Sequence, residues 1–188
     1  DNWGSPTGKR ELCAFSGSDG IKSTDYQTAF REGGGMAIAG LARVSKLGVK
    51  GDFTSEQYLA AAEKAYAHLS EKQGIGKSCE YCDDHKENII DDYTALLAAT
   101  ELYVATEKVD YLKDARARAT NLIGRLSDDG YFWSDDAKTR PFWHASDAGL
   151  PLVALVRYAE IESKITVTMQ GGLIDWYCVD MIGVSCDN

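Results

Sequence analysis

The chain has 188 residues, of which 44% are hydrophobic and 26% charged, and its formal net charge is −9 with a pI near 4.8. This length suits one domain with a hydrophobic core of its own. No apolar run approaches the roughly 18–20 residues of a membrane span. The negative charge, without any cluster of lysine and arginine, argues against a nucleic-acid partner. An acidic surface fits neutral or cationic ligands, sugars included, and fits plain solubility equally well.

The cysteines suggest a compartment. There are five, scattered along the chain: Cys13, Cys79, Cys82, Cys178 and Cys186. A secreted disulfide framework usually has an even number in a smaller chain, and the polar first residues show no signal-peptide pattern. We therefore expect mainly reduced thiols and a cytoplasmic location, with a secreted or periplasmic one as the alternative.

The first half of the chain predicts a loop and two helices. Residues 1–22 are rich in glycine and serine, whereas apolar residues recur at spacings of three and four from residue 25 to about 46. The run Gly33–Gly34–Gly35 interrupts this helix, at a cost of roughly 1 kcal/mol for each glycine. It favours close packing against a neighbour over a ligand contact or a break. Residues 54–57 form a capping-box pattern, which begins a second helix that ends near Gly74.

The second half predicts three more helices. Two span residues 89–106 and 109–126, and their short link makes them an antiparallel hairpin. A fifth helix begins at the N-cap candidate Ser146, carries Pro151 in its first turns and ends near Ser163. Residues 165–168 and 176–179 are more strand-like. The sequence thus predicts an all-α fold of antiparallel helix hairpins over residues 1–163, with an irregular or strand-like tail over 164–188.

Adjacent carboxylates near a helix start are the first candidate site. Asp91, Asp92 and Tyr93 open the helix predicted at residue 89. The helix dipole stabilises acidic residues there, so a structural role is natural. In a toroid of helix hairpins, however, helix starts surround the central cleft, where a carboxylate beside a tyrosine binds sugar hydroxyls or transfers a proton. Both interpretations stay open.

A segment that is both aromatic and polar is the second candidate. Trp143 and His144 precede the helix that Asp147 begins. Aromatic faces stack on pyranose rings, while His and Asp bond the hydroxyls, so we favour a substrate-binding role. The structural alternative places Trp143 in the core and leaves Asp147 as a helix cap. Asp92 and Asp147 are the candidates for catalysis.

The third candidate is a metal site that the sequence supports only weakly. Cys79, Cys82 and His85 have spacings compatible with three zinc ligands, but a structural zinc site needs a fourth. The preceding Lys77–Ser78 is not strand-like, which disfavours a thioredoxin-like motif. We expect no metal and no cofactor.

Four strings resemble glycoside hydrolase family 9, in particular its bacterial branch that trims β-1,4-linked gluco- or glucosamine-oligosaccharides from the end. They are residues 16–20, 30–39, 81–93 and 144–151. The resemblance covers about residues 1–163. It implies part of an (α/α)6 toroid and hydrolysis with inversion, in which an Asp activates water and a Glu acts as acid about 6.5–9.5 Å away.

The chain departs from that family at its catalytic motifs. The family's Asp-Ala-Gly-Asp base motif lies upstream of the matching region and its acid Glu lies far downstream. Asp147–Ala148–Gly149 is followed by Leu150, so the base role is not carried over. We therefore expect this chain alone to be inactive, and we expect self-association through uncovered helix faces.

Two other functions stay open. A sugar epimerase-like toroid is the second enzymatic reading, because an Asp-Asp-Tyr before a Leu-rich helix also occurs in such folds. A helical binding or scaffold module, with a zinc-clamped loop at Cys79, Cys82 and His85, is the non-enzymatic one.

Overall fold

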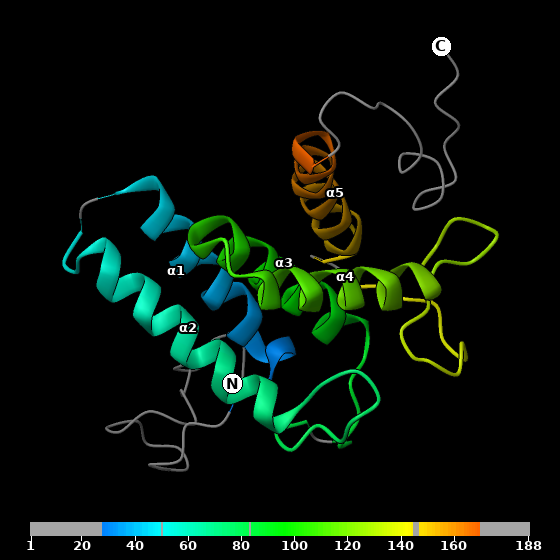
Figure 1. The fold of residues 1–188 in the computed structure, drawn as a ribbon. Coiled ribbons are helices and arrows are strands. Elements are labelled where there is room, and N and C mark those ends of the chain that lie inside the picture. Colours follow the sequence, from blue (N-terminus) through cyan, green and yellow to red (C-terminus); the bar gives the residue numbers. More distant parts are fainter. Residues whose placement is uncertain (1–27, 50, 83, 145–146, 170–188) are drawn as a thin grey trace, which may run out of the picture.

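The computed structural model describes residues 28–49, 51–82, 84–144 and 147–169. Within them every regular element is helical, which confirms the predicted all-α class (Figure 1). The predictions for residues 1–22, for Ser146, for the run 176–179 and for Cys13, Cys178 and Cys186 lie outside the described residues. The elements are the π-helix η1 (Phe30–Gly34) and the α-helices α1 (Gly35–Leu47), α2 (Ser55–Lys72), α3 (Ile89–Thr106), α4 (Val109–Gly124) and α5 (Leu150–Met169).

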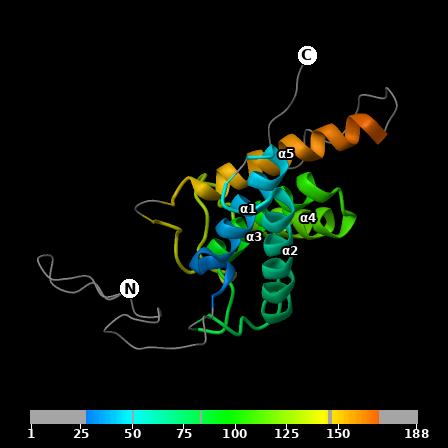
Figure 2. The ribbon, with the colours of Figure 1, turned by 90° about the vertical axis from the view of Figure 1, so that its left-hand side faces the viewer.

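Helix α3 is the centre of the molecule. It packs against α1, α4 and α5, while α2 covers α1, and Figure 2 shows α5 running across the top of this bundle. Every residue of α3 from Asp91 to Leu102 is buried, because neighbouring elements cover this helix on several sides. The core includes the large side chains Phe30, Ile38, Tyr66, Leu69, Ile89, Tyr93, Leu96, Leu97, Leu102, Leu122, Leu155 and Tyr158.

The glycine run lies where η1 passes into α1, against α3. A Cβ atom added to Gly35 would lie 2.6 Å from the Cβ of Thr94 and 2.7 Å from its carbonyl carbon. Such distances are far inside van der Waals contact, so only glycine allows the two helices to approach this closely. The packing interpretation of the run is confirmed.

Two helices, α2 and α3, begin with reciprocal capping boxes, of which the first was predicted. Thr54 and Gln57 form a reciprocal capping box at the start of α2. Asn88 and Asp91 form a second one at the start of α3, which the sequence pattern had not indicated. Glu107, in a left-handed conformation with φ of 61°, ends α3 and turns the chain into α4. The predicted hairpin of α3 and α4 is therefore confirmed.

The end of α5 differs from its prediction. The helix continues through residues 165–168 to Met169, so the strand-like interpretation of this run is wrong, and the expected boundary after residue 163 falls inside α5. The β-branched residues there favour strands only weakly on their own. Extending an existing helix, by contrast, adds a hydrogen bond for each residue fixed.

Charged side chains fix α3 to its neighbours. The Glu101 carboxylate, only 5% exposed, accepts from Arg43 of α1 at 3.0 Å and from Arg157 of α5 at 2.6 Å. This arrangement satisfies a buried charge, which would otherwise be costly, and it sets the position of α5 on α3.

The outer face of α5 is apolar at its first turns. Leu152, Val153 and Val156 are 56%, 54% and 52% exposed. The self-association that such a face would allow stays a prediction. None of the described helices combines the length and the hydropathy needed to cross a membrane.

Candidate functional site

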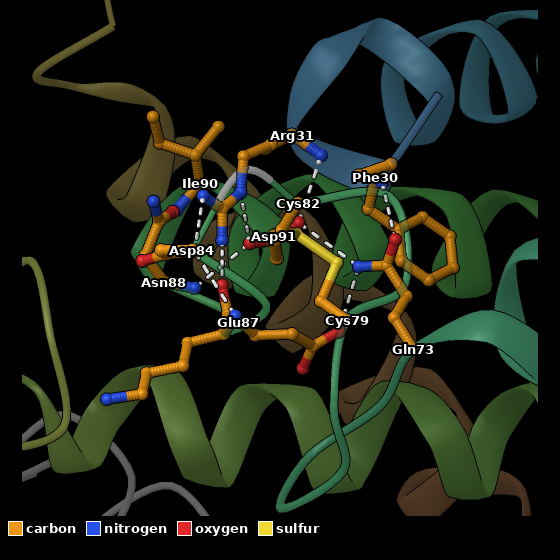
Figure 3. A network of polar contacts seen from close by, with 12 residues as sticks. Phe30, Arg31, Gln73, Cys79, Cys82, Asp84, Glu87, Asn88, Ile90 and Asp91 are labelled. Carbon is orange, nitrogen blue, oxygen red and sulfur yellow. Dashed lines mark hydrogen bonds and ion pairs between the residues drawn. A yellow bond between two sulfur atoms is a disulfide. The ribbon is translucent and has the colours of Figure 1, made fainter. Parts of the chain in front are cut away.

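Asp91 is enclosed by donors from three other segments (Figure 3). The backbone N–H and Nε of Arg31 donate to its two carboxylate oxygens at 3.1 and 2.8 Å. Gln73 Nε2 and the N–H of Asn88 add bonds of 3.1 and 2.9 Å. A carboxylate has about four acceptor positions, and Asp91 is 0% exposed. It joins η1, the loop after α2 and the first turn of α3, and it has no surface for a substrate in this conformation.

Asp92 points instead towards α4. Its carboxylate accepts from Arg118 at 3.0 Å, from Asn121 at 2.8 Å and from Arg125 at 2.7 Å, and it is also 0% exposed. Burial raises the pKa of Asp92, while the charges of Arg118 and Arg125 oppose the rise. A raised pKa is also typical of catalytic acids, but this carboxylate is held by three donors out of reach of solvent. Its contacts are those of a structural residue.

The third residue of the motif reaches a different region. The Tyr93 hydroxyl donates to Oδ2 of Asp147 at 3.3 Å, and its ring lies 6.3 Å from that of Phe142. His144 Nδ1 lies 3.5 Å from the same carboxylate oxygen. Burial, followed by the charge of Asp147, raises the pKa of Tyr93, so the phenol stays a donor at neutral pH. Helix α3 and the start of α5 thus meet through a tyrosine–carboxylate bond.

This cluster is partly open to solvent. The side chains of Asp147 and His144 are 30% and 47% exposed, and the neighbouring Trp143 is 80% exposed. The structural alternative, in which Trp143 belongs to the hydrophobic core, is therefore wrong. We call Tyr93, Phe142, Trp143, His144 and Asp147 the aromatic–carboxylate cluster.

The loop between α2 and α3 contains a disulfide in place of free thiols. Cys79 and Cys82 are bonded to each other and are 0% and 2% exposed. The expectation of reduced thiols is wrong for this pair, because the path of the loop brings the two buried sulfurs within bonding distance. His85 Nδ1 lies 3.4 Å from the carbonyl oxygen of Cys79.

These contacts bear on the weak zinc candidate. One carboxylate oxygen of Asp91 and the two sulfurs lie within 4.8 Å of one another. The sulfurs are used in the disulfide, however, and a thiolate is what binds zinc. All four acceptor positions of Asp91 are also taken. The donor set of this structure does not fit a zinc ion.

The predicted site residues therefore fall into two groups. Tyr93, His144 and Asp147 come together, whereas Asp91 and Asp92 face away from them into separate networks. Sequence reasoning missed the partners Arg31, Arg118 and Arg125. Arg118, Asn121 and Arg125 recur at spacings of three and four, and such a polar stripe on an otherwise amphipathic helix was the available signal.

A groove lies elsewhere, on the outer side of α4. Its volume is about 690 Å³, and it is lined by Ile75, Ala117 and Gly124 together with Arg116, Thr120, Asn121, Arg125, Asp135, Asp136 and Lys138. Charges of both signs line it, several of them in ion pairs of their own. It is lined by none of the predicted site residues, although Asn121 and Arg125, which donate to the buried Asp92, belong to its lining.

The chain has no significant match to a family model or to a curated protein, so its function has to be inferred from its own residues.

Proposed function

We propose that this chain supplies a sugar-binding subsite to a glycoside hydrolase that cleaves β-1,4-linked gluco- or glucosamine-oligosaccharides, within an (α/α) toroid. The observation that carries the proposal is the bond from Tyr93 to Asp147, whose side chain is 30% exposed and which follows the 80% exposed Trp143 by four residues. Resemblance to glycoside hydrolase family 9 supports the same class.

The chemistry of the cluster suits a pyranose ring. The indole of Trp143 offers a flat apolar face, and such faces combine a large contact area with little loss of conformational freedom. Asp147 accepts hydrogen bonds from sugar hydroxyls at its solvent-facing side, and charged acceptors make the stronger bonds. Tyr93 is only 1% exposed and acts as a positioning residue, because its hydroxyl holds the carboxylate in place.

The arrangement of helices is compatible with the toroid. Helix α3 lies between α1 and α5, while α2 covers α1 and α4 covers α3. This is a two-layer succession of hairpins, and an α/α toroid is built by continuing such a succession around a ring.

Hydrolysis with inversion needs a base for the attacking water and an acid for the departing oxygen, on opposite sides of the bond. Asp91 and Asp92 are fully enclosed by structural donors, and Asp147 alone cannot fill both roles. We therefore propose that the chain alone binds the sugar but does not cleave it.

The test is direct binding of cellobiose and of the chitosan dimer by calorimetry, with sugar release measured in parallel. We expect binding, and a rise of about tenfold in Kd for Trp143→Ala, equivalent to about 1.4 kcal/mol. The matched control is Phe53→Ala, which removes another exposed aromatic side chain (59%) away from the cluster. Equal losses in both variants, or no binding by the unaltered chain, would reject the subsite. Robust sugar release would show that a complete acid–base pair lies within these residues.

A further inference from the structure

The loop between α2 and α3 has a small hydrophobic core of its own. Cys79 and Cys82 form it with Ala29, while Tyr81 packs against them, apart from the main core. Backbone bonds surround the pair: the N–H of Cys79 donates to the carbonyl of His85 at 3.0 Å, and the N–H of His85 donates to that of Cys82 at 3.1 Å. Because the disulfide supplies most of this apolar core, the loop depends on it for its shape.

The disulfide lies beside the Asp91 network. In Figure 3 the sulfur–sulfur bond is next to Asp91, with Arg31 and Gln73 on either side. Gln73 also accepts from the N–H of Phe30 at 3.0 Å and donates to Glu87 at 2.9 Å. Arg31 contacts the loop as well, through the carbonyl of Lys86 and through Asp84 at 3.5 Å. The loop, η1 and the first turn of α3 therefore share one set of bonds.

We propose that the Cys79–Cys82 disulfide is a redox-controlled clamp that holds residues 74–88 on the first turn of α3 and, through it, keeps the aromatic–carboxylate cluster in shape. The second half rests on the proposed function. Tyr93 follows Asp91 by two residues, directly after that turn, and it is the residue that donates to Asp147. Loosening the turn therefore loosens the carboxylate that binds sugar.

The chemical step is thiol–disulfide exchange with a small dithiol. Its thiolate attacks one cysteine sulfur and breaks the sulfur–sulfur bond, and the other cysteine leaves as a thiolate that takes a proton. The second thiol of the reagent then displaces the first cysteine, also protonated on release, and the reagent ends as a cyclic disulfide. The two electrons gained by the protein come from the dithiol. Two separate thiols no longer hold the loop closed, and local opening of such a loop is detected by hydrogen exchange.

The experiment uses the full chain with Cys13, Cys178 and Cys186 replaced by serine, so that only this pair responds to reductant. Amide exchange is followed by mass spectrometry, with and without dithiothreitol. We expect reduction to speed exchange over residues 74–88 at least tenfold and to leave α2 unchanged. The matched control, Cys79→Ala with Cys82→Ala in the same background, should exchange like the reduced protein and ignore the reagent.

Sugar affinity is measured on the same samples, and a rise of about threefold or more in Kd on reduction is expected. Equal exchange in the oxidised and reduced states, or two free thiols in the air-oxidised protein, would overturn the clamp. Faster exchange with an unchanged Kd would overturn only its influence on the cluster. If reduction speeds exchange over residues 74–88 but the protein binds sugar in neither redox state, the proposed function is contradicted and the clamp is established.

Discussion

Three consecutive residues at the start of α3 belong to two regions with opposite character. Asp91 and Asp92 lie in closed networks, where backbone N–H groups, amides and guanidinium groups occupy the carboxylates and exclude solvent. Tyr93 reaches the aromatic–carboxylate cluster, where it donates to Asp147, whose side chain is 30% exposed. A carboxylate with every acceptor position filled stabilises the fold, whereas one with a solvent-facing side is able to bind a ligand.

The difference teaches that a pair of acidic residues is not by itself evidence of catalysis. Neighbouring residues on a helix point about 100° apart. Each of the three side chains therefore contacts a different element of the structure. Asp91 meets η1 and the loop after α2, Asp92 meets α4, and Tyr93 meets the start of α5.

Replacing the buried carboxylate should have the largest effect. Asp92→Asn removes the carboxylate that Arg118 and Arg125 share and leaves them only Glu87 and Asp136 as counter-charges. Breaking buried ion pairs in this way costs up to about 3–5 kcal/mol of unfolding free energy. Urea titration followed by circular dichroism measures it. The matched control is Asp110→Asn, whose side chain is 87% exposed in a pair with Lys113 and should change stability by less than about 1 kcal/mol. A stable Asp92→Asn variant that no longer binds sugar would assign Asp92 to the functional region.

A substitution at the close approach of α1 to α3 should have the next largest effect. Gly35→Ala places a methyl group against Thr94, and overpacking of this kind costs about 1–3 kcal/mol. Gly40→Ala is the control, because a Cβ there meets nothing within 4 Å, and helix propensity should stabilise it by about 0.5–1 kcal/mol. Thermal unfolding of both variants gives the comparison. A harmless Gly35→Ala would mean that the helices are not packed as described.

High pH should lower the unfolding free energy through the buried tyrosines, by a smaller amount than these substitutions do. Burial raises the pKa of Tyr66 and Tyr93 above the ordinary 10.0, and the neighbouring Asp114 and Asp147 add to the rise. The folded protein keeps these protons where the unfolded chain loses them. Stability is therefore complete below about pH 10 and falls above it, by about 1.4 kcal/mol per pH unit for each such tyrosine.

Unfolding at pH 9 to 11, with phenolate absorbance recorded on the folded protein, measures this loss. Tyr93→Phe should reduce the loss of unfolding free energy per pH unit by the contribution of one tyrosine, about 1.4 kcal/mol. If Tyr93 ionises in the folded protein near pH 10, its bond to Asp147 is not formed.

The smallest effect on stability is expected at the open cluster. Asp147→Asn should change the unfolding free energy by less than about 1 kcal/mol, because a partly exposed group exchanges its protein contacts for water at little cost. The same variant should weaken binding of the chitosan dimer, measured by calorimetry. A loss of stability as large as that of Asp92→Asn would erase the distinction between the two regions.

Much of the fold could be predicted from local sequence. The periodicity and the capping box at Thr54 placed α2, α3 and α4 to within two residues at their ends. The run 165–168 was misjudged because β-branched residues favour strands, a preference that an already formed helix overrides. The disulfide was missed because its formation depends on a loop path that residue spacing alone does not fix.

By itself the sequence determined the all-α class, the starts of α2, α3 and α4 and the net negative charge, since these depend on composition or on residues within a few positions of one another. Only the tertiary structure decided which carboxylates are buried. The donors that enclose Asp91 and Asp92 come from as far as 60 and 33 residues away. The hydrogen bond between Tyr93 and the partly exposed Asp147 spans 54 residues. Burial and the filling of acceptor positions arise from such distant neighbours, so no local pattern distinguishes a structural aspartate from one that meets solvent.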